Sequence, residues 1–216
     1  VGSATQLEHI QVHMNKDDGI EFFGGTVNAR WILITGCADD QFDWTDGWRG
    51  KGQYWICQQY TDDADQGIEA DNNGDENSAE PMSNPIISNL TLIGAANGNG
   101  ESDIGMLLRE GTGATIVNAI GMNFGDNGFD IDQDATFDNV AEGNLVVDYS
   151  LFYDNELSIG GVGSRICNVS SSHVWINNSI LRSGSLYDSA STTSIAYSNI
   201  EGGYAGSGNI DADPGW

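Results

Sequence analysis

Basic residues are scarce in this sequence. Seven Lys and Arg stand against 32 Asp and Glu, which gives a formal net charge of −25. Such a field repels polyanions, so we expect neither nucleic acid nor an anionic lipid surface as a partner. Acidic chains are often disordered, but 39% hydrophobic residues and six tryptophans favour a folded core.

Cysteine and long apolar runs are also in short supply. Cys37, Cys57 and Cys167 form an odd set without a CxxC pair, which excludes a zinc knuckle and a dense disulfide framework. A single bridge between Cys37 and Cys57 is one alternative, and buried free thiols are the favoured one. No apolar run reaches the length of a membrane span, so we predict none.

Proline is rare and helical periodicity is weak, whereas glycine is abundant. The chain has 3 prolines and 29 glycines, which suits many tight corners. No long stretch combines apolar residues at three- and four-residue spacing with helix caps. These absences favour an all-β fold.

A short phrase recurs along the chain, in which glycine or a polar residue precedes alternating apolar and polar positions. Its copies begin at positions 19, 41, 67, 105 and 128. Repeats at this spacing predict a solenoid, and alternation with period two predicts strands. We therefore predict a single all-β domain over residues 1–216, a parallel β-helix of about eight rungs, with an acidic loop insertion at about 60–85.

A second series of strands accompanies the first. Its six-residue segments begin at Leu7, Val27, Ile87, Val147, Ile176 and Ile195, with looser copies at Ile116 and at Tyr54–Cys57. Their third positions are His9, Asn89, Tyr149, Asn178 and Tyr197, with Asn118 in the looser copy. We interpret this column as a structural corner whose side chains stack from rung to rung, as amides do in stacked strands.

Alternation places acids on the outside of the first series. If Ile20 and Phe22 point inward, the residues between and after them point outward. The first outward column is then Glu21, Asp43, Glu69, Leu107 and Asp130, and the second is Phe23, Thr45, Asp71, Arg109 and Asp132. Like charges one rung apart repel by roughly 3–4 kcal/mol at an effective dielectric near 20. Such a column needs water, a bound cation or raised pKa values, and calcium is the expected cation because it takes six to eight oxygen ligands.

The acidic loop adds further candidate ligands. Oxygen-bearing side chains alternate from Asp71 to Asn77 and could converge on one hard cation, although Gly74 and Met82 do not fit an EF-hand. The candidate calcium ligands are Asp43, Glu69, Asp71, Asn73, Asp75, Asp130 and Asp132, with Asp62, Asp63 and Asp65 nearby. Calcium binding is favoured over a merely solvated acidic face. We expect Arg109 to form ion pairs that relieve the repulsion between Asp71 and Asp132.

A candidate ligand-binding patch follows the strand at Trp44. An exposed Trp48 beside Arg49 and Lys51 could stack on a sugar ring or bind an anionic glycan. Packing of Trp48 over a turn is the favoured alternative.

The repeated phrases, together with the closing Asn209-Ile210-Asp211-Ala212-Asp213-Pro214, resemble the pectate-lyase-like superfamily of right-handed parallel β-helices. Within it, the chain most resembles the secreted bacterial β-helix repeat proteins. The resemblance implies a right-handed parallel β-helix and a secreted or cell-surface location. It says little about activity, because the superfamily includes lyases, hydrolases, adhesins and phage spikes.

Two functional hypotheses follow. The favoured one is an extracellular calcium-binding module with a structural, adhesive or glycan-binding role and no catalysis. The alternative is a calcium-dependent polysaccharide lyase or related carbohydrate-active enzyme, in which the resemblance gives Arg109 the role of base. A polysaccharide or cell-surface glycan is the expected partner class, and end-to-end self-association is open because solenoid ends present free strand edges.

Overall fold

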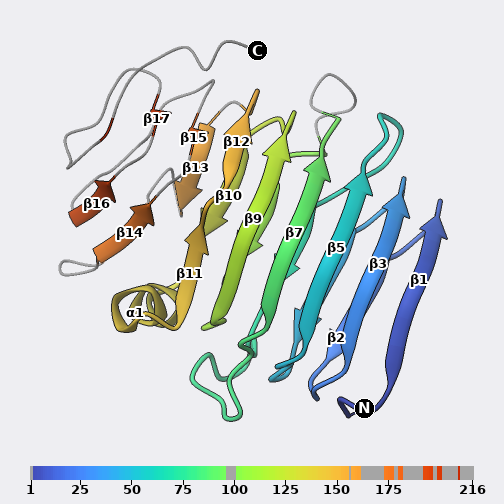
Figure 1. Ribbon diagram of the computed structural model, residues 1–216, viewed down its shortest axis with the longest axis horizontal. Helices are drawn as coiled ribbons and strands as arrows, with labels where there is room; N and C mark the ends of the chain where they lie inside the picture. The colour runs from blue at the N-terminus through green and yellow to red at the C-terminus, as the bar shows by residue number, and fades with distance from the viewer. Residues whose placement is uncertain are drawn as a thin grey trace.

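The chain forms a solenoid of two parallel sheets. The computed structural model describes residues 2–95, 101–155, 157–161, 173–177, 180–181, 192–196, 199–200 and 209. Long strands lie side by side in one sheet, and short strands lie behind them in the other (Figure 1). The main path of the long sheet contains eight strands in the order β1-β3-β5-β7-β9-β11-β14-β16. The predicted parallel β-helix of about eight rungs is therefore confirmed.

From β1 to β11 the strands alternate between the two sheets along the chain. The long sheet contains β1 (Gln6–His13), β3 (Asn28–Thr35), β5 (Lys51–Gln58), β7 (Ile86–Ile93), β9 (Ala114–Met122), β11 (Leu145–Asp148), β12 (Leu151–Tyr153), β14 (His173–Asn177), β15 (Ile180–Leu181), β16 (Thr192–Ala196) and β17 (Asn199–Ile200). The short sheet contains β2 (Ile20–Phe23), β4 (Phe42–Thr45), β6 (Ile68–Ala70), β8 (Met106–Leu108), β10 (Asn127–Ile131) and β13 (Leu157–Gly161).

The core lies between the sheets and is aromatic in its first rungs. Trp55 stacks on Phe42 with ring centroids 4.5 Å apart, and Phe22 stacks on Trp48 at 4.2 Å. The indole nitrogen of Trp55 donates to the carbonyl of Ala29, so its one polar atom is satisfied. The inward positions predicted for the short strands, such as Phe42, are buried, except Ile20 at the first rung, which is partly buried.

On the rungs from β1 to β12, the long strand turns a corner at one residue in the left-handed conformation. The corner residues are His9, Trp31, Tyr54, Asn89, Asn118 and Tyr149, all exposed and with φ between 53° and 58°. A left-handed residue bends the strand sharply without an inserted loop. The predicted corner is therefore confirmed for its described members, while Asn178 and Tyr197 lie outside the described residues.

One register prediction is wrong. The sequence pattern matched Leu7 with Val27, but the structure pairs Leu7 with Ala29. The carbonyl of Ala29 accepts a hydrogen bond from the Trp55 indole of the next rung at 3.0 Å. This shift of two residues keeps the same side chains inward, and it places Trp31 at the corner beside His9.

The helix α1 (Asp134–Glu142), between β10 and β11, departs from the all-β prediction. Phe137 and Val140 are buried at a spacing of three residues, and Gly143 ends the helix in the left-handed conformation. The segment is too short for the periodicity to stand out in the sequence.

The two described cysteines are free thiols. Cys37 and Cys57 are both fully buried, and burial raises the pKa of Cys57 to about 12. The disulfide alternative is therefore wrong for this pair, and Cys167 lies outside the described residues.

Candidate metal centre

The acidic column predicted from alternation is present. Strand pairing places Glu21 beside Asp43, Asp43 beside Glu69, and Leu107 between Glu69 and Asp130. Parallel pairing stacks equivalent residues about 4.8 Å apart. The side chains of β2, β4 and β6 therefore bring three carboxylates into successive rungs, and Leu107 ends that run.

Two further acidic residues lie beside this column, in the turns that precede β2 and β4. Asp18 lies three residues before Glu21, and Asp40 lies three residues before Asp43. Asp40 accepts a hydrogen bond from the backbone amide of Gln66 at 2.8 Å, and Asp18 accepts one from the amide of Asp40 at 3.2 Å. These backbone contacts fix both carboxylates beside the column.

Asp43 is the centre of this arrangement, which we call the Asp43 cluster: Asp18, Glu21, Asp40, Asp43 and Glu69. Carboxylate oxygens of Asp18, Glu21 and Asp43 lie within 4.8 Å of one another, and so do those of Asp40, Asp43 and Glu69. Asp43 belongs to both groups and is only 8% exposed. Its Oδ1 atom is buried and has no hydrogen-bond partner.

Burial gives these carboxyl groups high proton affinity. It raises the pKa of both Asp40 and Asp43 to about 9, with repulsion from Glu69 adding to the shift at Asp40 and from Glu21 at Asp43. Burial also raises the pKa of Glu69 to about 7 and that of Asp18 to about 6. The folded chain therefore favours a bound proton or a bound cation at this place over four free negative charges.

The donor set fits calcium. All five side chains offer carboxylate oxygens, and hard cations prefer oxygen ligands. Calcium–oxygen distances of about 2.3–2.6 Å place opposite ligands on one ion roughly 4.6–5.2 Å apart. The oxygen separations in the two groups around Asp43 agree with that requirement.

Arg109 limits the cluster on its far side. Its guanidinium contacts Asp71 through Nε at 2.9 Å and Glu69 through Nη2 at 2.8 Å. Burial lowers the pKa of Arg109, but the hydrogen bond and charge of Asp71, together with Glu69, raise it above its usual value overall. The contacts with Asp71 and Glu69 agree with the predicted ion-pairing role of Arg109.

The predicted pairing of Arg109 with Asp132 is replaced by the pairing with Glu69. Asp132 instead accepts a hydrogen bond from the amide of Gln133 at 2.7 Å. Burial raises the pKa of Asp130 to about 7, and repulsion from Asp132 adds to that shift. Asp130 and Asp132 thus form a separate acidic pair beyond Leu107.

The loop ligands do not converge as predicted. Asn73 Oδ1 accepts hydrogen bonds from the amides of Asp75 and Glu76, so it closes a turn of the loop. Asp71 is engaged by Arg109, and Asp75 is exposed. Alternation along the sequence misled here because turn residues do not alternate in direction as strand residues do.

A second acidic region continues from the cluster. Asp39, Asp40 and Asp65 have carboxylate oxygens within 4.8 Å of one another. The adjoining hollow of about 340 Å³ is lined by Ala38, Asp39, Asp63, Ala64, Asp65, Glu101 and Asp103. Of Asp62, Asp63 and Asp65, it is Asp65 whose carboxylate lies near a member of the Asp43 cluster, Asp40.

The predicted sugar-stacking tryptophan is wrong. Trp48 is fully buried, and its indole nitrogen donates to the carbonyl of Val27 at 3.1 Å. Phe22 stacks on one face of its ring, and because no part of the side chain is exposed, neither face is available to a ligand. The favoured alternative, in which Trp48 packs over a turn, is confirmed.

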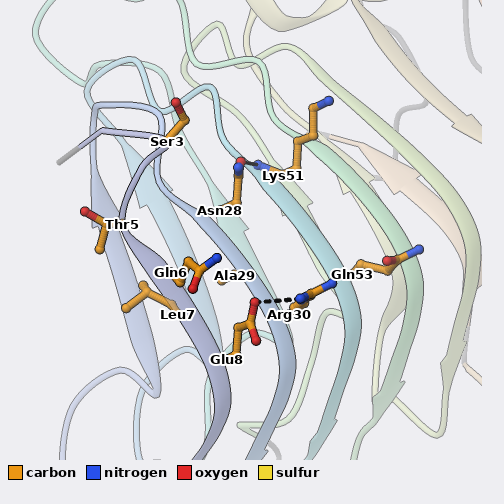
Figure 2. Close-up of a pocket in the computed structure, with 10 residues that line it drawn as sticks. All are labelled: Ser3, Thr5, Gln6, Leu7, Glu8, Asn28, Ala29, Arg30, Lys51 and Gln53. Atoms are coloured by element: carbon orange, nitrogen blue, oxygen red, sulfur yellow. Dashed lines mark hydrogen bonds and ion pairs between the residues drawn. The ribbon is translucent and has the colours of Figure 1, made fainter.

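Arg49 and Lys51 are exposed, but they do not build an anion site with Trp48. Lys51 borders a hollow of about 290 Å³ at the start of the long sheet (Figure 2). Arg30 on the same hollow is paired with Glu8 at 2.7 Å, and Lys51 extends away from that pair in Figure 2. The charge of Arg30 in this hollow is therefore neutralised by Glu8.

Asp18 and Asp40 are the residues that the sequence reasoning missed. The signal was available: an acid recurs three residues before the outward acid in two successive copies, at Asp18-x-x-Glu21 and Asp40-x-x-Asp43. Gln66 and Asn127 occupy the corresponding places before Glu69 and Asp130.

The chain belongs to the family described as the pectate-lyase like beta helix domain, which matches residues 1–197. No curated protein and no solved structure matched the chain significantly. Among the described residues, no helix has the length and apolar character needed to cross a membrane.

The raised pKa values predict an unusual pH dependence for the metal-free protein. The folded chain keeps protons on Asp40 and Asp43 that the unfolded chain releases, between the ordinary value of 3.8 and the folded value of about 9. Because the unfolded state then binds fewer protons, stability falls as pH rises through that window. In EDTA, the melting temperature should be lower at pH 8 than at pH 5.

The Asp43→Asn variant separates the contribution of Asp43 to this pH dependence from that of acidic groups elsewhere in the chain. Asparagine imitates the protonated carboxyl group, so the variant in EDTA should melt at a higher temperature than the wild type at pH 8. Scanning calorimetry at several pH values measures both effects. A melting temperature that rises from pH 5 to pH 8 in EDTA would contradict the assignment.

Proposed function

We propose that this protein is an extracellular calcium-binding β-helix module with a structural role and no catalysis. The observation that carries the proposal is the buried, unpartnered Oδ1 atom of Asp43, which lies among four other carboxylates. An ionised carboxylate in such a place is costly unless a cation compensates it. Calcium bound at either of the two groups that share Asp43 would supply that compensation.

Asp43 would be the ligand common to both groups, with Asp18 and Glu21 in one group and Asp40 and Glu69 in the other. Ligands from β2, β4 and β6 would tie three consecutive rungs together. In a solenoid each rung is stabilised mainly by its neighbours, so a cross-rung ligand set adds to the interface terms that hold the array together. The chemistry supplied by the ion is charge neutralisation.

An extracellular location agrees with this role. Extracellular calcium modules work with dissociation constants of about 10⁻⁴–10⁻³ M, a range suited to millimolar calcium. The paired Arg109 gives no support to the lyase alternative, because its charge is already used by Asp71 and Glu69.

Titration calorimetry with calcium chloride tests the proposal. The wild type should bind calcium in preference to magnesium, and Asp43→Asn should weaken binding by about a hundredfold or more, because it removes the central charged ligand. Asp130→Asn is the matched control, since Asp130 occupies the same column beyond Leu107. Equal binding by wild type and Asp43→Asn would reject the site.

A further inference from the structure

From β1 to β12, the part of the long sheet whose side chains the structure describes, one face has no formal charge. It consists of the outward residues that follow the corner on each rung, which we call the neutral face: Gln11, His13, Leu33, Thr35, Ile56, Gln58, Thr91, Ile93, Ile120, Met122, Leu151 and Tyr153. None of these is Asp, Glu, Lys or Arg, although the chain carries 39 such residues, 7 basic and 32 acidic. The outward residues before the corner, by contrast, include Glu8, Arg30 and Lys51.

The neutral face is also apolar to an unusual degree for an exposed sheet. Ile56 is 46% exposed, Ile120 38% and Leu33 37%. Aromatic side chains border it along the corner, where the rings of Trp31 and Tyr54 lie nearly parallel, with an interplanar angle of 6°. An exposed apolar patch that runs over several strands marks an interaction site more often than a plain solvent surface.

An uncharged hollow continues the neutral face at its other border. It has a volume of about 340 Å³ and is lined by Gln58, Gln59, Tyr60, Thr61, Gly94, Ala95 and Asn123. Amide, hydroxyl and phenol groups provide hydrogen bonds there without any charge. Binding sites of this type combine apolar contact area with a few polar groups that fix orientation.

Size argues against a second copy as the occupant. From β1 to β12, six strands about 4.8 Å apart and four residues long give the described part of the face roughly 24 by 13 Å, or about 300 Å². A stable protein interface needs about 800 Å² from each partner. Two copies would also bring together two chains that each carry −25 charges. A long, narrow and uncharged ligand fits the dimensions and the charge.

We propose that the neutral face binds a neutral polysaccharide chain that lies along the solenoid axis. The carbon-bound hydrogens of sugar rings would contact Leu33, Ile56 and Ile120, and the hydroxyl groups would reach the polar residues of the adjoining hollow. The field of the protein excludes acidic polysaccharides from this role. This site is separate from the Asp43 cluster, which lies on the short sheet.

Affinity electrophoresis in native gels tests the site. Galactomannan and hydroxyethylcellulose serve as neutral probes and polygalacturonate as the acidic one, each with calcium and with EDTA. The protein should be retarded by at least one neutral probe under both conditions. Polygalacturonate should not retard it in EDTA.

Two charge insertions locate the binding surface. Ile56→Glu and Ile120→Glu should each weaken binding at least about tenfold, because the ligand would desolvate an unpaired charge. Ile86→Glu is the matched control, since Ile86 is also an isoleucine of a long strand and also 46% exposed, but lies before the corner. Circular dichroism establishes that each variant is folded.

Three results would overturn the proposal. The first is a failure of both neutral probes to retard the wild type. The second is retardation that survives both charge insertions. The third is a wild-type dimer, detected by sedimentation and abolished by Ile56→Glu, which would assign the neutral face to a second copy of the chain.

Discussion

Withdrawal of calcium should lower the melting temperature by about 5–11 °C at pH 7.5. With a dissociation constant of about 10⁻⁴ M, calcium at about 10 mM is present at a hundred times that constant and stabilises the folded state by about 2.7 kcal/mol. One kcal/mol corresponds to roughly 2–4 °C for a domain of 150–250 residues. Differential scanning fluorimetry in about 10 mM calcium chloride, in EDTA, and in EDTA followed by excess calcium measures the effect and its reversibility.

The variants make this measurement specific to the Asp43 cluster. Asp43→Asn should melt at the same temperature with and without calcium, because it lacks the central ligand. Asp130→Asn should retain the wild-type response. A full calcium response in Asp43→Asn would place the stabilising ion elsewhere in the chain.

Truncation of Trp55 to alanine should destabilise the protein by about 3–5 kcal/mol, the range for large aromatic side chains in a core. Trp55 is fully buried and stacks on Phe42 at 4.5 Å and on Phe22 at 6.0 Å. Its removal would leave a cavity between the two sheets and orphan the carbonyl of Ala29. The melting temperature should fall by roughly 6–20 °C.

Ile56→Ala is the control for the tryptophan. Ile56 is the next residue of β5, points to the opposite side and is 46% exposed. Surface substitutions of this kind usually change stability by no more than about 0.5 kcal/mol. Comparable losses in the two variants would mean that the aromatic core does not dominate the stability of the first rungs.

The sequence predicted the strand faces well because two independent patterns agreed. The repeat aligned Asp43 with Glu69, and alternation directed both side chains outward, which is how the structure pairs them. Alternation alone left the register of Val27 undetermined, because a shift of two residues preserves every inward and outward assignment. In the structure Leu7 pairs with Ala29, which places Trp31 at the corner, where its ring stacks on His9.

The turns were predicted less well, for a physical reason. Asp40 and Trp48 both lie outside the strands, where no period fixes the direction of a side chain. Asp40 turns toward the column because its carboxylate accepts the amide of Gln66, and Trp48 turns inward because Phe22 offers a stacking surface. Both interactions join different rungs, so neither is visible in a single repeat.

The single-residue corner makes a whole rung the natural unit of length change in this protein. Insertion or deletion of one complete repeat would leave the remaining strands paired and the remaining corners aligned, from His9 to Tyr149. Loss of one residue within a long strand would instead reverse every side chain up to the next corner and expose core residues to water. Engineered lengthening should therefore copy entire rungs, and natural variation in length should occur in the same steps or in the loops between strands.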